Sequence, residues 1–185
     1  MTTQPAIVRP LHKWEIEEGG VVFGDSLDYG QVRVHECATW TDAIHRLGHR
    51  LRRMPEPDEG EHNAITLGNH CYFPIFMPRD FSGPGDRLGM PWLVHELTHA
   101  WQFQHTGWLY LLRALWVQIR EGQQGYEFGG ADGLRQARLK KRTLRDFNPE
   151  QQGNIAMTYY VRLRTQQPDD ALSAWLPFIE EFRNP

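Results

Sequence analysis

Residues 92–102 read Trp-Leu-Val-His-Glu-Leu-Thr-His-Ala-Trp-Gln and contain the motif H-E-x-x-H at His95, Glu96 and His99. On a helix, residues four apart lie one turn apart on the same face. The two imidazoles can therefore bind one zinc ion together. Glu96 lies about 100° further round the helix. There its carboxylate can act as a base on a water molecule that the metal activates, without itself binding the metal.

The rest of this segment favours a buried helix. A helix is expected from Pro91, a favourable first-turn residue, to about His105. No proline follows His95 in it. The alternative is a surface helix with two solvated histidines, but the flanking tryptophan, leucine and valine side chains argue against it. The uncharged residues around the motif are Leu93, Val94, Leu97, Thr98, Ala100 and Trp101.

A catalytic zinc site needs a third protein ligand and an open position. The metzincin continuation H-x-x-G-x-x-H is absent, because the segment from Ala100 to His105 lacks the glycine and places His105 at the wrong spacing. The remaining arrangement is that of gluzincins, with an acidic ligand on a later helix. Glu150 and Glu121 are the best candidates, since helical spacing aligns each with apolar residues. Glu127, in a glycine-rich stretch, is a third, and the pattern alone does not separate them.

Composition bounds the class of protein. A chain of 185 residues is expected to form one domain, and a hydrophobic content of 40% excludes wholesale disorder. The formal net charge of -3 gives no electrostatic case for nucleic acid. The longest apolar stretch, 109–119, is interrupted by Arg113 and Gln118 and is too short to span a bilayer. The N-terminus lacks the features of a signal peptide, so we expect synthesis in the cytoplasm without one.

The expected fold class is α+β, with a β-rich first third and a helical remainder. Residues 21–23 and 31–35 are expected to be short strands, and residues 64–76 have strand character. Thr41 is expected to cap a helix that reaches Arg53. The later helices are expected at 109–121, at 134–145, from Pro149 behind the cap Asn148 to before Pro168, and after a cap at Asp169 or Asp170, the last one broken or kinked at Pro177.

Three stretches of the chain carry a family resemblance. They are residues 22–29 (Val-Phe-Gly-Asp-Ser-Leu-Asp-Tyr) with 32–35, the H-E-L-T-H-A-W-Q helix, and Glu-Gln-Gln at 150–152. Together they resemble bacterial Vgr-related H-E-x-x-H proteins over most of the chain, from residue 12 to residue 165. The same type of domain is similar to the zinc metallopeptidase extension of some type VI secretion spike proteins. More distantly, it is similar to the metallopeptidase-like core domains of extracellular contractile injection systems.

This resemblance implies a zincin-like fold of the gluzincin type, in which a small N-terminal β-sheet packs on the H-E-x-x-H helix and a mainly helical half follows. It implies that His95, His99 and a downstream glutamate bind one zinc ion. Relatives commonly read Glu-Gln-Gln-Ala-Glu-Ile at the later stretch, whereas this chain has Gly153 and Asn154 in place of the alanine and the second glutamate. Glu150 is then the only carboxylate of the segment and the favoured third ligand.

Five further side chains are candidates for contact with a substrate. His70 and Tyr72 alternate on the strand before the motif helix, and in this fold type such a strand can pair with an extended substrate. Ordinary strand packing explains them equally well. Tyr159, Tyr160 or Tyr126 could donate a hydrogen bond to an oxyanion, although core packing is the simpler explanation for each.

Two basic runs and two cysteines have simple explanations. The runs at 46–53 and 135–145 lack interleaved aromatic residues, so we expect solvated helix faces rather than a nucleic-acid surface. Contact with an anionic partner or a cell-wall polymer is the alternative. Cys37 and Cys71 are expected to be small buried thiols, which could pair only in an oxidising compartment.

The leading hypothesis is a zinc-dependent hydrolase of amide bonds in a peptide or protein, with Glu96 as general base. A peptidoglycan amide is a variant of the same chemistry. The resemblance implies a type VI secretion effector, with a spike or immunity protein as partner, delivered to a target-cell compartment such as the periplasm. The alternative is a zinc-stabilised structural or adaptor part of a secretion apparatus. Glu96 argues against it, because structural zinc needs four closed ligands and no base. Nucleic-acid binding is the weakest hypothesis.

Overall fold

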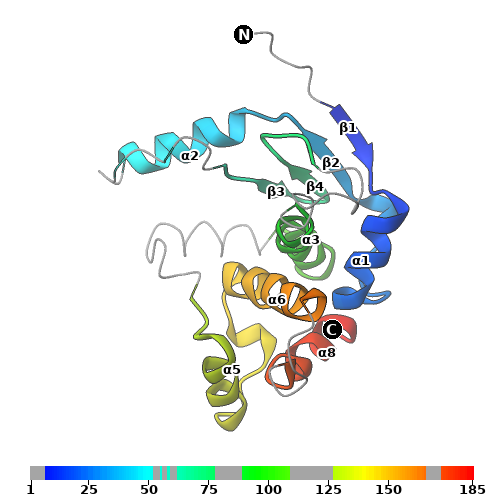
Figure 1. The fold of residues 1–185 in the computed structure, drawn as a ribbon, viewed down its shortest axis with the longest axis vertical. Coiled ribbons are helices and arrows are strands. Elements are labelled where there is room, and N and C mark those ends of the chain that lie inside the picture. The colour runs from blue at the N-terminus through cyan, green and yellow to red at the C-terminus, as the bar shows by residue number, and fades with distance from the viewer. Residues whose placement is uncertain are drawn as a thin grey trace.

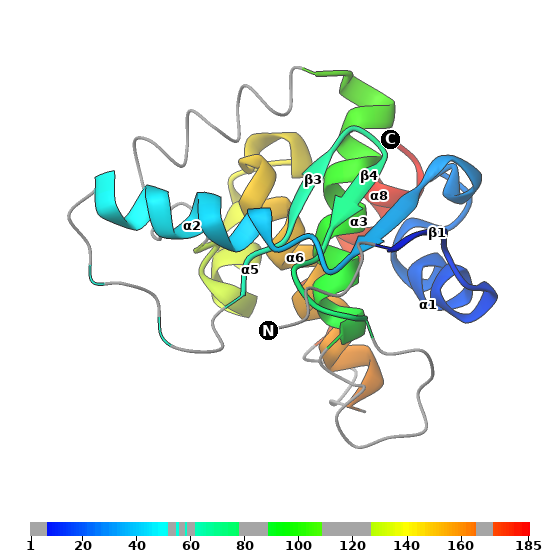
Figure 2. The same cartoon turned by 90° about the horizontal axis from the view of Figure 1, so that it is seen from above.

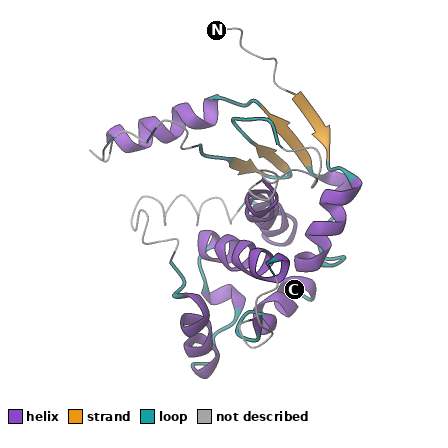
Figure 3. Ribbon diagram, viewed as in Figure 1, coloured by secondary structure: helices purple, strands orange, loops and turns teal. Residues whose placement is uncertain are grey.

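The computed structural model describes residues 7–51, 55, 58, 62–77, 89–108, 127–165 and 172–185. Figure 3 shows strands confined to the N-terminal half and helices throughout. The elements are β1 (Ile7–Pro10), α1 (Lys13–Phe23), η1 (Tyr29–Gln31), β2 (Arg33–Glu36), α2 (Trp40–Leu51), β3 (Ile65–Leu67), β4 (His70–Tyr72), α3 (Gly89–Thr106), α5 (Gly130–Leu139), η4 (Leu144–Asp146), α6 (Pro149–Arg164) and α8 (Leu176–Arg183).

Helix α3 lies at the centre of the structure, between the sheet and helix α6 (Figure 1). Seen from above, β3 and β4 lie over α3 (Figure 2). Helix α1 contacts α3, α6 and α8, and α5 lies beyond α6 on the side away from the sheet. The architecture is thus α+β, with a small sheet and a helical C-terminal half, as expected. No helix within the described ranges is both long and apolar enough to cross a membrane.

The sheet has the strand order β1-β2-β4-β3. Strand β1 is antiparallel to β2, β2 is parallel to β4, and β4 is antiparallel to β3. Residues paired directly across strands project from the same face. Val34, Cys71 and Thr66 pair in this way and are all buried, and Thr66 hydrogen-bonds Glu96 on α3. This face of the sheet therefore packs on α3.

A half-buried arginine joins β1, α1 and β2. Arg9 on β1 donates hydrogen bonds to both carboxylate oxygens of Glu15 on α1, at 2.7 and 2.8 Å, and to Glu36 on β2 at 2.8 Å. Both glutamate side chains are fully buried. The hydrogen bonds and the charge of the Arg9 guanidinium therefore compensate for the free energy that the carboxylates lose on leaving water. Strand β1 is absent from the sequence expectations, because only four residues with alternate exposure carry little signal.

Residues 21–23 are helical, so the strand prediction there is wrong. They form the last turn of α1 and extend the buried face that begins at Glu15 and Gly19. Three consecutive apolar residues fit either a helix or a strand, and here the helix-forming residues upstream decide. The helix ends at Gly24, whose φ of +55° suits a residue without a Cβ.

The strand character of residues 64–76 corresponds to a hairpin of two strands, β3 and β4, rather than to one strand. Gly68, with φ +62°, and Asn69 form the two-residue loop between them. Glycine at the first loop position is typical of a type II′ turn. The strand predicted at 31–35 is confirmed in β2, which starts at Arg33.

Most predicted helices agree with the structure except at their ends. The helix predicted at 134–145 is wrong over its second half, because α5 ends at Leu139 and residues 144–146 form the separate 3-10 helix η4. Helix α2 begins at Trp40, so Thr41 lies in its first turn and does not cap it, and α3 begins two residues before Pro91. Asn148 caps α6 as predicted. Pro177 lies in the first turn of α8 and does not break it, because a first-turn residue needs no backbone N–H donor. Residues 109–121 and the predicted caps at 169–170 lie outside the described residues.

Candidate metal centre

Helix α3 places the three motif residues in the interior. His95 and His99 lie one turn apart with ring centroids 5.0 Å from each other, and both are buried, at 9% and 7% exposure. Glu96 is buried as well, at 4% exposure. A surface helix with solvated histidines is thereby excluded.

The first turn of α6 carries Glu150 to these histidines. Asn148 accepts a hydrogen bond from the backbone N–H of Gln151 at 2.8 Å, while the Gln151 side chain accepts one from the Asn148 backbone at 3.1 Å. This reciprocal capping box, with Pro149 as the first helical residue, fixes the start of the helix. Glu150 is therefore held in a rigid turn and not on a loop.

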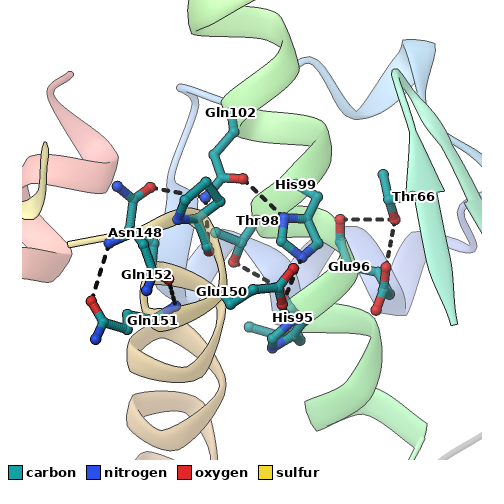
Figure 4. Close-up of polar contacts among 12 residues, drawn as sticks. Thr66, His95, Glu96, Thr98, His99, Gln102, Asn148, Glu150, Gln151 and Gln152 are labelled. Atoms are coloured by element: carbon teal, nitrogen blue, oxygen red, sulfur yellow. Dashed lines mark hydrogen bonds and ion pairs between the residues drawn. The ribbon is translucent and has the colours of Figure 1, made fainter. Parts of the chain in front are cut away.

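The three side chains converge on one point (Figure 4). Glu150 Oε2 lies 3.2 Å from His95 Nε2 and 3.6 Å from His99 Nε2. One potential ligand atom from each residue lies within 4.8 Å of the others, and all three residues are buried. Two imidazoles and a carboxylate match the donor set of a three-ligand zinc site. This group could hold a metal ion.

Gly153 lets α6 approach α3 closely at this point. A Cβ atom at this position would lie 2.7–2.9 Å from three ring atoms of His95. Such separations are shorter than a carbon–carbon van der Waals contact, so a side chain there would push the imidazole or the helix away. The absence of a side chain at Gly153 is therefore what allows His95 and Glu150 to meet.

The electrostatics of the group favour positive charge. Burial alone would lower the pKa of His99, but the charge of Glu150 and a hydrogen bond with it raise that pKa to about 9. Burial alone would raise the pKa of Glu150, but the charge of His99 and hydrogen bonds with both histidines hold it well below its usual range. The buried carboxylate thus attracts a proton, or another cation, to the point between the rings.

Glu96 is oriented separately, by the sheet. The Thr66 hydroxyl on β3 donates a hydrogen bond to Glu96 Oε2 at 2.7 Å, and both side chains are buried. Figure 4 shows the Glu96 carboxylate directed to Thr66. Thr66 is absent from the sequence predictions, because nothing in the sequence indicates which side chain of β3 meets α3.

Sequence reasoning also missed Gln102 and Gln152. Gln102 follows His99 by three positions and so lies on the same face of α3. Its Oε1 lies 2.9 Å from His99 Nδ1, and its Nε2 donates to Pro149 O at 3.0 Å and to Gln152 Oε1 at 2.9 Å. The position of Gln102 three residues after His99 was the signal in the sequence that could have indicated this contact.

The structure does not bring His70 and Tyr72 to this group. They project from the face of the sheet opposite to Val34, Cys71 and Thr66, away from α3. Strand β4 is also paired on both sides, by β2 and β3, so its backbone has no open edge for an extended substrate. The predicted substrate role of these two residues therefore lacks support from their positions.

Packing and a distant hydrogen bond account for two of the tyrosine candidates. The hydroxyl of Tyr160 donates to Glu18 on α1 at 2.7 Å, and Tyr159 is part of the buried core, so the oxyanion role of both stays a prediction. Glu127 is exposed. Glu121 and Tyr126 lie outside the described residues.

The cysteines and basic residues behave largely as expected. Cys37 and Cys71 are both free thiols, although only Cys71 is fully buried. Most side chains of the basic run at 135–145 are exposed. These residues therefore indicate no second centre.

Comparisons with known proteins relate the chain to one secreted effector. No family model matches the sequence. The chain is 30% identical over 161 residues to the type VI secretion system spike protein VgrG2b of Pseudomonas aeruginosa, a match that covers 83% of this chain and 13% of that protein. The solved effector domain of VgrG2b has the same fold, with a TM-score of 0.56 and 26% identity, covering 92% of this chain and 83% of that one. The chain is homologous to the effector domain of VgrG2b.

Proposed function

We propose that residues 1–185 form a single zinc metallopeptidase domain of the gluzincin type, with a zincin-like fold, which acts as a type VI secretion effector. The observation that carries the proposal is the convergence of His95, His99 and Glu150, in a chain homologous to an effector domain. His95, His99 and Glu150 would hold the ion. A bound zinc ion would act as a Lewis acid on the substrate carbonyl and lower the pKa of water.

Glu96 is the proposed general base, and it lies close enough to the group for its charge to raise the pKa of His99. It follows His95 directly, so its carboxylate leaves the helix about 100° from the ligand. The hydroxyl of Thr66 donates to one carboxylate oxygen, which orients the side chain and leaves the second oxygen to accept a proton. In the proposed reaction, Glu96 takes a proton from the attacking water and passes it to the leaving amine.

The number of ligands favours catalysis over a structural role. A structural zinc site is closed by four protein ligands, whereas catalytic sites have three and an open position. Across the described residues, the group of metal-binding side chains has three members. A non-catalytic, zinc-stabilised component of the secretion apparatus would need neither an open position nor a buried base.

The effector role rests on homology. Because this chain spans 13% of the length of VgrG2b, we limit the proposal to the domain. In this proposal the domain is delivered by a type VI system to a target-cell compartment such as the periplasm, and it associates with a spike and an immunity protein. The substrate is a peptide or protein, and a peptidoglycan amide is the second substrate to test.

The test compares wild type with Glu96→Gln, using fluorescently labelled casein and purified peptidoglycan sacculi as substrates and elemental analysis for bound metal. The proposal predicts one zinc ion per chain in both proteins, and hydrolysis by wild type that falls at least about 100-fold in the variant. The matched control is Glu17→Gln, an exposed glutamate on α1, which should keep full activity. Hydrolysis by Glu96→Gln at the wild-type rate would refute the mechanism.

A further inference from the structure

Gln102 lies between the two helices that supply the metal ligands. It is buried, at 3% exposure, on α3 and faces the first turn of α6 (Figure 4). Its side-chain amide contacts His99 on one side and Pro149, the residue before Glu150, on the other. The Gln102 side chain therefore contacts both the ring of His99 and the backbone next to Glu150.

The orientation of the Gln102 amide follows from its partners. A backbone carbonyl can only accept a hydrogen bond, so the group 3.0 Å from Pro149 O must be the NH2. The oxygen of the amide then faces His99 Nδ1 at 2.9 Å and can only accept. His99 must therefore carry a proton on Nδ1, which leaves the lone pair of a neutral ring on Nε2. Nε2 is the atom that faces Glu150.

Gln152 on α6 locks the same orientation from the other side. Its Nε2 donates to the backbone oxygens of Leu144 and Phe147, both at 3.0 Å. Its Oε1 is therefore the atom that accepts from Gln102 at 2.9 Å. Turning either amide by 180° would place an oxygen against a carbonyl oxygen. The buried amide of Gln102 and the half-buried amide of Gln152 thus hold each other in one orientation, and this orientation defines which nitrogen of His99 donates.

We propose that Gln102 is a positioning residue of the metal centre, which fixes the Nδ1–H form of His99 and couples that ring to the turn that carries Glu150. The inference rests on the proposed metal binding but not on catalysis. Groups that hold the second nitrogen of a histidine ligand typically contribute about 10- to 100-fold to metal affinity. Gln152 is proposed to act through Gln102, because its Oε1 accepts a hydrogen bond from the Gln102 amide.

The first test measures zinc affinity by competition with a chromogenic chelator. Gln102→Leu should bind zinc about 10- to 100-fold more weakly than wild type, and Gln152→Leu should show a smaller loss in the same direction. The double variant should resemble Gln102→Leu, because the second change acts on a contact already removed. The matched control is Gln104→Leu on the same helix, whose amide contacts Asp28 and Asn69 and which should bind as wild type does.

The second test needs no variant. In protein labelled with 15N-histidine, long-range 1H–15N spectra should show a proton on His99 Nδ1 in both the metal-free and the zinc-loaded form. An unprotonated Nδ1 in either form would overturn the inference. Equal zinc affinities of Gln102→Leu and a zinc-binding wild type would overturn it as well. If wild type itself bound no metal, the proposed function would fail and the inference with it. The two failures are thus distinguishable.

Discussion

Among the described side chains, two pairs of neighbouring histidines can be compared, and they differ in almost every property except proximity. His95 and His99 lie on α3 in the interior, whereas His35 and His70 lie on adjacent strands, on the face of the sheet that points away from α3. The outer rings are close, with His35 Nε2 only 2.8 Å from His70 Nδ1. Close approach of two imidazoles therefore does not by itself define a metal site.

Their surroundings make the difference. The inner pair is buried and meets Glu150, and within the described part of the chain it is this pair that belongs to a three-residue group of metal-binding side chains. The outer pair packs instead on Tyr72, with His35 and Tyr72 ring centroids 4.1 Å apart. The surroundings also shift the histidine pKa in opposite directions. Glu150 raises the pKa of His99, whereas burial and then the charge of His70 lower the pKa of His35.

The largest expected effect comes from removing one histidine of each pair. His99→Ala should lower zinc affinity by more than the 10- to 100-fold typical of an outer partner, at least about 100-fold, because it removes a ligand. His70→Ala should leave the affinity and the stoichiometry of one zinc per chain unchanged. Isothermal titration with zinc on both variants measures the contrast. Equal losses in the two would erase the distinction between the pairs.

A smaller effect is expected from adding one methyl group beside the inner pair. Gly153→Ala should reduce the free energy of unfolding by about 1–3 kcal/mol, since its Cβ would overlap the ring of His95. It should also weaken zinc binding. The same change at Gly20, on α1, meets no atom within 4 Å and should stabilise the protein by up to about 1 kcal/mol through helix propensity. Urea denaturation of both variants measures the two changes in the free energy of unfolding. An unchanged free energy of unfolding in Gly153→Ala would contradict the close approach of α6 to α3.

The next effect in size comes from removing the hydrogen bond that Thr66 donates to Glu96, the proposed base. Thr66→Val removes the donor to Glu96 at nearly constant volume and should lower kcat on labelled casein about tenfold, the equivalent of about 1.4 kcal/mol. Zinc affinity should not change. Thr98→Val is the control, because that buried hydroxyl on α3 contacts only the Val94 carbonyl among the hydrogen bonds described for it. Similar kcat values for both variants would show that Thr66 does not orient Glu96.

The smallest effect concerns the outer pair and pH. Burial and the neighbouring His70 lower the pKa of His35, so the folded state binds fewer protons than the unfolded state as pH falls below about 6.5. The associated stability is present above that pH and is lost below it. His35→Asn should therefore flatten the decline in the free energy of unfolding between pH 7 and pH 5. An unchanged slope would show that the folded state does not lower the pKa of His35.

The sequence was most informative where local chemistry sets the structure. Pro91 and the uncharged motif residues predicted α3, and Asn148 with Pro149 predicted the start of α6, because caps and first-turn prolines act within a few residues. Strand β1 depends instead on a partner far away in the chain, through the contact of Arg9 with Glu36, and the helical state of residues 21–23 follows from the residues upstream of them. Short apolar runs carry no such information.

The candidate centre divides in the same way. The H-E-x-x-H spacing located His95, Glu96 and His99, and the family resemblance favoured Glu150, which the structure brings to both histidines. Gln102 and Thr66 were missed, because amide and hydroxyl side chains are common and their partners lie 47 and 30 positions away in the chain. The substrate roles predicted for His70 and Tyr72 required knowledge of which face of β4 meets α3.

The zinc affinity of Glu150→Gln tests the central claim most directly. This variant keeps the shape of the side chain and removes the charge that joins α6 to the histidines on α3. We predict that it binds zinc at least about 100-fold more weakly than wild type, since it loses a ligand rather than an outer partner. Zinc binding at wild-type affinity would contradict the account, because the third ligand would then be a different residue.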